Sequence, residues 1–202
     1  MALVILPQPA AASARLAPVE ARYAPLFCFF LLTAACALAS LAFACATPFA
    51  AFAVLAAAML PLQPALVVVG AAWLVNQAIG FGLQGYPADI HTIMWGLAIG
   101  AAAIVATATS ALVLRTLQRS REPAAFALAL IAAYAADELV LFAVTPFLGG
   151  AGAFTAAIVG RLGVLSALWL IGLIVACEAL RLPNSMRWRQ LVGAADEHER
   201  QR

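Results

Sequence analysis

The sequence predicts an all-α, polytopic membrane protein with six transmembrane helices. Hydrophobic residues make up 66% of the chain and charged residues only 10%, which is more apolar surface than one soluble core of this size can bury. The apolar residues form runs long enough to cross a bilayer. Every Lys or Arg position is an arginine, and nearly all of them lie between or beyond these runs.

A membrane-spanning helix needs about 20 mostly apolar residues, and six runs are candidates. In order along the chain they are residues 25–46, 48–60, 64–83, 90–114, 123–145 and 154–182. Four of them begin at a proline, where the missing N–H of the first helical turn costs nothing. The second run is short, so it needs neighbouring helices around it or a re-entrant path.

The arginines indicate how the chain is oriented. Residues 1–24 form an N-terminal tail, and residues 183–202 form an amphipathic C-terminal tail. Arginine occurs in both tails and in loop 115–122, whereas the remaining loops have none. Because cytoplasmic segments are enriched in basic residues, six crossings place both termini in the cytoplasm. No basic stripe with interleaved aromatic residues occurs, so the expected surroundings are lipid and not nucleic acid.

The four cysteines show no spacing that is typical of a metal site or a disulfide framework. They are Cys28, Cys36, Cys45 and Cys177. Each is expected to be a small buried hydrophobe.

Ionisable residues are costly inside a membrane and require a partner or a function. Asp137 and Glu138 lie in the fifth run, and Arg161 lies in the sixth. Counted from the expected helix ends, Asp137 and Arg161 lie about 10–12 Å below the outer surface. Since helices joined by a short loop are neighbours, we expect Arg161 to pair with one of the two acids.

Segment 73–100 places uncharged polar side chains at a similar depth. Asn76 and Gln77 lie near the end of the third run, Tyr86 lies in the following loop, and Trp95 lies near the start of the fourth run. Together with the three ionisable residues they predict a ligand-binding layer that opens to the outside. The alternative is that these side chains fix helix packing and bind nothing.

His91 follows the same loop. Its imidazole could bind a transition metal, and the neighbouring Asp89 could orient the ring. The alternative is an ordinary histidine at the membrane interface.

Small residues form two patterns that let helices approach closely. Gly96 and Gly100 form a GxxxG motif in the fourth run, and Ala35 and Ala39 form a ridge on the first. The glycines suit packing within the bundle, whereas the alanine ridge could face another membrane protein.

The run WLVNQAIGFG, followed by YP and WGLAIG, resembles a known family when it is combined with six short spans and an alanine ridge. The chain is similar to the S components of energy-coupling-factor (ECF) vitamin transporters, and most narrowly to the BtuM-like cobalamin transporter group. The similarity is closest over residues 73–100 and architectural elsewhere. It implies a bacterial inner-membrane subunit, or a solitary transporter, that takes up cobalamin or a related corrinoid, with no catalytic residue and no intrinsic cofactor.

The resemblance also implies roles for individual residues. Asn76, Gln77 and Arg161 would donate hydrogen bonds to the corrin carboxamides. Tyr86 and Trp95 would contact the apolar faces of the ring.

Two further roles follow from the resemblance. Members of the group can present a cysteine to the cobalt, whereas residues 76–91 contain none, so His91 could take its place as axial ligand. The ridge at Ala35 and Ala39 would meet a T component that carries ATPases.

Two rival functions remain. A membrane-embedded hydrolase could use Asp137, Glu138 and His91 for acid–base or metal-assisted chemistry, although no HExxH or GxSxG motif is present. Adjacent acids on a helix also point about 100° apart. An assembly protein could use the same polar layer for packing alone.

Overall fold

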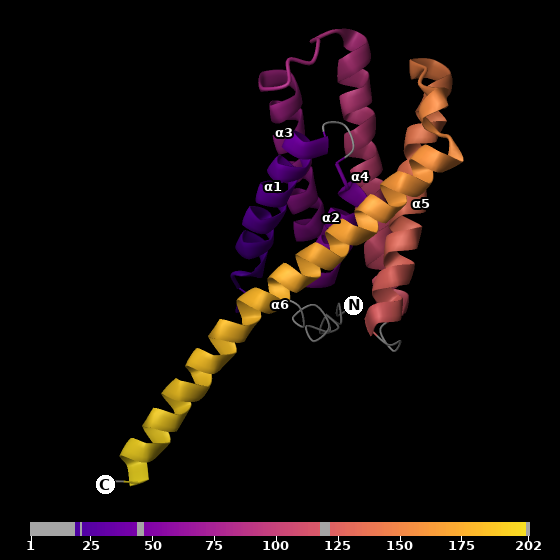
Figure 1. The fold of residues 1–202 in the computed structure, drawn as a ribbon. Helices are drawn as coiled ribbons and strands as arrows, with labels where there is room; N and C mark the ends of the chain where they lie inside the picture. The colour runs from indigo at the N-terminus through magenta and orange to yellow at the C-terminus, as the bar shows by residue number, and fades with distance from the viewer. Residues whose placement is uncertain (1–18, 21, 44–46, 118–121, 201–202) are drawn as a thin grey trace, which may run out of the picture.

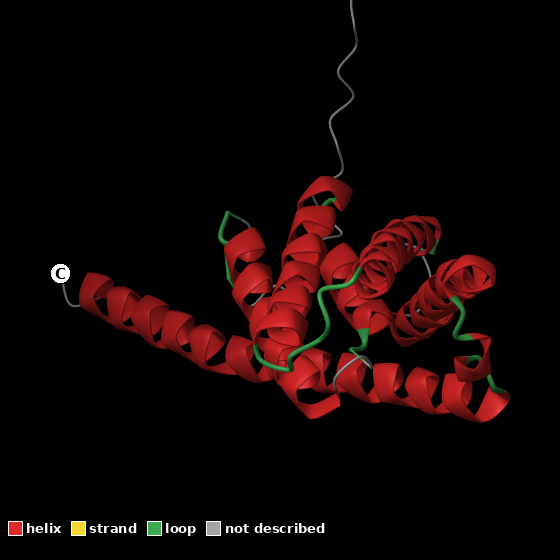
Figure 2. Ribbon diagram, turned by 90° about the horizontal axis from the view of Figure 1, so that it is seen from above, coloured by secondary structure: helices red, strands yellow, loops and turns green. Residues whose placement is uncertain are grey.

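A computed structural model describes residues 19–20, 22–43, 47–117 and 122–200, without the side chains of Glu122 and of residues 181–200. Within these ranges the chain forms helices and no strand, which confirms the all-α prediction (Figures 1 and 2). The elements are α1 (Ala24–Phe43), α2 (Phe49–Met59), α3 (Leu62–Gly82), α4 (Ile90–Thr116), α5 (Glu122–Leu148), the 3₁₀-helix η1 (Ala151–Ala153) and α6 (Ala156–Arg200).

Five of these helices, α1, α3, α4, α5 and α6, are long and apolar enough to cross a membrane. Helix α2 has only 11 residues and is therefore about 16 Å long, roughly half the thickness of a hydrocarbon core. The described residues thus contain five membrane-length helices and one short apolar helix, where the sequence predicted six spans.

Helices α1 and α3 run parallel, although only α2 separates them in the sequence. Cys36 Sγ donates to the Ala72 carbonyl at 3.0 Å, and Asn76 Nδ2 donates to Ser40 Oγ at 2.9 Å, so both helices advance by four residues between the two contacts. The intervening segment must therefore return the chain to the starting end of the bundle. Helix α2 provides this return, and the chain direction alternates through all six helices (Figure 1).

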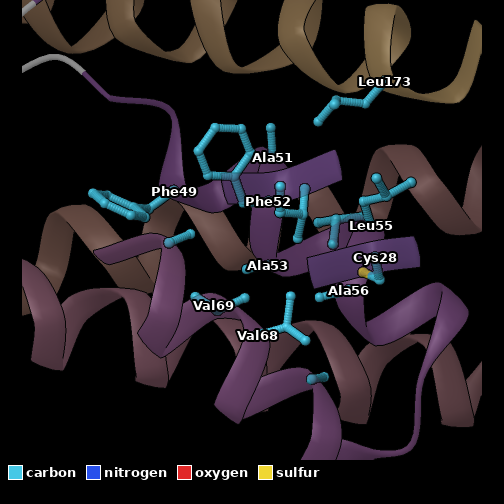
Figure 3. Close-up of a cluster of buried hydrophobic side chains, with 14 of the residues drawn as sticks. Cys28, Phe49, Ala51, Phe52, Ala53, Leu55, Ala56, Val68, Val69 and Leu173 are labelled. Atoms are coloured by element: carbon cyan, nitrogen blue, oxygen red, sulfur yellow. The ribbon is translucent and has the colours of Figure 1, made fainter. Parts of the chain in front are cut away.

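Helix α2 forms the centre of the core. It contacts every other α-helix, and the side chains of Phe52, Val54 and Leu55 are fully buried. Figure 3 shows Phe52 and Leu55 in this core. The rest of α2 is mostly alanine, which allows neighbouring helices to approach closely. A helix too short to span a bilayer is tolerated where protein surrounds it, and α2 contacts all five other α-helices.

Helix α5 continues through Pro146 to Leu148, three residues beyond the end that the sequence predicted. Proline has no N–H for the carbonyl one turn earlier, which here belongs to Phe142. Thr145 Oγ1 donates to this carbonyl at 2.8 Å. The hydroxyl thus replaces the missing backbone donor, and the helix passes the proline.

Helix α6 packs against α2 and α5. Its backbone is helical from Ala156 to Arg200, so the expected tail boundary at residue 183 does not coincide with the end of a helix. The helix lies along one side of the bundle, and its C-terminal part projects away from the other helices (Figures 1 and 2).

Candidate functional site

A polar cluster joins α1, α3 and the start of α2. Asn76 Nδ2 donates to Ser40 Oγ at 2.9 Å and to Thr47 Oγ1 at 3.0 Å. Gln77 Nε2 donates to Asn76 Oδ1 at 3.0 Å, and Gln84 Nε2 donates to the Ser40 carbonyl at 2.7 Å. Both hydrogens of the Asn76 amide are therefore used within the protein, which favours the packing role that the sequence left open.

The GxxxG motif of α4 receives two side chains from α3. Gln77 Oε1 lies against Gly96, and Trp73 Cε2 lies 2.7 Å from the place where a Cβ of Gly100 would stand. Trp73 Nε1 also donates to the Gly96 carbonyl at 2.9 Å. The two glycines thus serve contacts within the bundle.

The two aromatic residues of the expected ligand layer contact different segments. The ring of Tyr86 packs on Gly80, with Cδ2 only 2.8 Å from the position of a Cβ there, and the Tyr86 amide donates to the Gly80 carbonyl at 3.0 Å. Trp95 lies beside Gly150, in the loop that follows α5. Both rings are partly buried, and each holds a loop against a helix.

His91 is exposed at the start of α4, and its Nε2 lies 2.7 Å from the Leu148 carbonyl oxygen. Because a carbonyl can only accept, Nε2 carries the proton, and in the neutral ring Nδ1 keeps its lone pair. Among the described residues no group of three or more His, Cys, Asp or Glu side chains could hold a metal ion. Within the described ranges, His91 thus has at most one further side chain of these types beside it for a metal ion.

Asp89 caps α4 and accepts a hydrogen bond from the Thr92 amide at 2.7 Å. This hydrogen bond lowers the pKa of the exposed Asp89 carboxyl below its ordinary value of 3.8, with a smaller contribution from the charge of His91. Asp89 thus fixes the first turn of the helix that carries His91.

Asp137 and Glu138 are partly buried on α5, and neither forms the expected ion pair with Arg161. The ion pair found in the described part of the chain joins Arg22 to Glu20 at 2.8 Å. Glu138 follows Tyr134 by one turn and lies on the same face of α5. Tyr134 therefore lies beside the acids. It was not singled out from the sequence, although its spacing of four residues from Glu138 indicates a shared helix face.

The rotation of α6 explains why the pair does not form. Tyr134 hydroxyl donates to the Val159 carbonyl at 2.6 Å, and its ring lies against Gly163. Val159 and Gly163 therefore face α5. Arg161 is two residues from each and lies about 160° away around the helix, so its side chain is exposed on the opposite face.

The expected layer is also spread in depth. Asp137 lies 11 residues, or about 16 Å, below the end of α5 at Leu148. Gln77 lies against Gly96, which is only six residues, or about 9 Å, below the start of α4 at Ile90. The structure brings Asn76 and Gln77 together near one end of the bundle and leaves the acids deeper.

Ala35 and Ala39 are buried, with exposed fractions of 6% and 0%, and Ala35 also lines an apolar groove between α1 and α6. The exposed face of α1 is formed by larger residues such as Leu38 and Leu41. A partner helix that approached α1 would contact these leucines before it reached Ala39.

Comparison of the chain with protein-family models, curated proteins and solved structures gives no match. Function must therefore be argued from the residues themselves.

Proposed function

We propose that this protein is a multi-pass membrane protein that binds a solute and carries it across a bacterial inner membrane, with a corrinoid as the ligand class. The observation that carries the proposal is the acid pair Asp137–Glu138. It lies within a membrane-length helix, and Arg161 does not neutralise it. Intramembrane carboxylates are costly and in general mark substrate, ion or proton pathways.

The choice of ligand rests on His91 and on the resemblance of residues 73–100 to the BtuM-like group. Hydrogen bonding to Leu148 fixes the His91 ring and leaves Nδ1 available at the exposed end of α4. Because the corrin ring supplies most of the cobalt ligands itself, Nδ1 of His91 would be the one ligand that the protein contributes. Tyr86, in the loop before α4, and Trp95, near the start of α4, would supply aromatic surface for the ring.

The alternation of chain direction through six helices supports an S-component-like arrangement. In this arrangement both termini lie in the cytoplasm, as the arginine distribution indicates, and the chain works alone or with a T component and its ATPases. The orientation can be tested with fusions. Green fluorescent protein at the C-terminus should fluoresce, and alkaline phosphatase fused after Ala88 should be active, whereas the reverse pattern would contradict it.

The ligand is tested with protein purified in detergent from cells grown with cyanocobalamin. We expect a corrin absorption spectrum, one-to-one binding by calorimetry, and at least about tenfold weaker binding by His91→Ala, because one metal–ligand bond is lost. The matched control is His198→Ala, since His198 is the only other histidine of the chain. A colourless protein with no heat of binding would refute the corrinoid assignment.

The closed network around Asn76 and Gln77 favours a second candidate, an assembly protein whose polar residues only fix packing. In the described residues no buried side-chain nitrogen or oxygen lacks a hydrogen-bond partner. This candidate predicts that Asp137→Asn combined with Glu138→Gln leaves cellular function unchanged, whereas the transport proposal predicts its loss.

A further inference from the structure

An apolar groove of about 420 Å³ lies between α1 and α6. Leu31 and Leu38 line it from α1, and Leu165, Leu168 and Gly172 line it from α6. On the α6 side, Trp169 separates the groove from the core, where its ring meets Phe52 at a centroid distance of 6.1 Å. The groove is thus open to the membrane and closed toward the interior.

Arg161 lies on the α6 face that lines this groove. Residues 161, 165, 168, 172 and 176 are spaced by three or four positions, so they share one side of the helix. Arg161 is exposed and belongs to no ion pair of the described residues. A free cation therefore stands next to an apolar groove.

The depth of Arg161 decides what can neutralise it. Val159 and Gly163, on either side of it, contact Tyr134, which is close to the middle of the 27-residue helix α5. Each end of α5 is therefore about 18–21 Å away along the axis, more than half of a hydrocarbon core that is about 30 Å thick. Arg161 is only five residues from the start of its own helix at Ala156, but it is level with the middle of α5. A carboxylate on a neighbouring membrane helix is a counter-ion at the same depth.

The same depth excludes a symmetric second copy. Two copies related by an axis perpendicular to the membrane would bring the same residues together at the same depth. Arg161 would then face Arg161 of the other copy, which is unfavourable between like charges in a medium of low dielectric constant.

We propose that the α1–α6 groove is a docking site for a transmembrane helix of another protein that carries an Asp or Glu near the middle of its span. Apolar side chains of this helix would fill the groove beside Leu165 and Leu168, where Gly172 allows close approach. Its carboxylate would pair with Arg161, which removes the cost of an isolated charge in lipid. The proposal requires only that the chain spans a membrane and is independent of the corrinoid assignment.

The test uses the full-length chain with a C-terminal fluorescent protein in phosphatidylcholine vesicles. The probe is an acceptor-labelled leucine–alanine helix of about 20 residues with Glu at its centre, compared with the same peptide carrying Leu there. We expect the Glu peptide to bind about tenfold more tightly, within the range that polar contacts between membrane helices give. Arg161→Leu should remove this preference, and Arg161→Lys should retain part of it.

Substitutions at two glycines of α6 distinguish loss of the groove from a general effect of adding a side chain to the helix. A Cβ at Gly172 or at Gly160 would meet no atom within 4 Å, and both residues are exposed, so a side chain can start at either position without a clash. Gly172→Leu fills the groove and should weaken binding of both peptides, whereas Gly160→Leu lies off the groove and should not.

Two results would overturn the proposal. The first is equal binding of the Glu and Leu peptides, which would leave lipid as the occupant of the groove. The second is energy transfer between two differently labelled copies of the chain that becomes stronger in Arg161→Leu. That outcome would assign the groove to a second copy.

Discussion

Trp73 shows how single residues set the separation of α3 and α4. Its indole donates to the Gly96 carbonyl, and its ring occupies the space above Gly100. The sequence predicted that these glycines serve bundle packing, and it did not reveal that Trp73 and Gln77 are their partners. A GxxxG motif specifies close approach, but it does not specify which side chain approaches.

Gly100→Ala should destabilise the protein by about 1–3 kcal/mol, because the new Cβ meets a rigid ring that is anchored by a hydrogen bond. Gly96→Ala should cost less, since the flexible end of Gln77 can move away. The measurement is thermal unfolding in detergent. Gly70→Ala is the control, because a Cβ at Gly70 meets nothing within 4 Å. Equal losses at Gly70 and Gly100 would contradict the role of Trp73.

Asp89 gives α4 a pH-dependent start. Its folded-state pKa is lowered from 3.8 by the Thr92 amide, so the unfolded state binds its proton more readily. The stabilisation is therefore complete above about pH 4 and is lost as the pH falls through the lowered pKa. The melting temperature of the wild type should exceed that of Asp89→Asn at pH 7, and this difference should vanish in strong acid. A melting-temperature difference between the two proteins that does not change with pH would refute the role of the Asp89 charge at the start of α4.

At the scale of elements, α2 shows what the sequence pattern could and could not provide. Its shortness was visible in the sequence, and the structure explains it, because the other helices surround α2 on all sides. The end of α5 was predicted wrongly, since Pro146 is an ordinary stop signal and the hydroxyl of Thr145 compensates for it here. The rotation of α6, which separates Arg161 from the acids, cannot be derived from depth alone.

Phe52 tests the central position of α2. Phe52 is fully buried and its ring meets Trp169 of α6, so Phe52→Ala leaves a cavity in the core and should destabilise the protein by about 3–5 kcal/mol. Phe147→Ala makes the same chemical change at a side chain that is 86% exposed and should change stability by less than about 0.5 kcal/mol. Denaturant unfolding in detergent measures both. Similar losses for the two variants would show that α2 is not the core.

At the scale of the whole molecule, composition and arginine placement were enough to predict a helical membrane protein, because apolar length and backbone satisfaction leave few other structures. The candidate site was less accessible to prediction. The sequence identified Asn76 and Gln77 as polar residues inside an apolar run. It did not identify Ser40 and Thr47 as the partners of Asn76, because these hydrogen bonds depend on the parallel arrangement of α1 and α3. No local pattern in the sequence encodes that arrangement.

Solute transport is the central claim, and accumulation of labelled cobalamin in cells tests it most directly. Cells that lack their own cobalamin uptake system would express the chain or an empty vector. We expect accumulation above the vector with the wild-type chain, and its loss when Asp137→Asn is combined with Glu138→Gln in a variant that remains folded in the membrane. Accumulation equal to that of the vector, with the wild-type chain present and folded in the membrane, would contradict the claim.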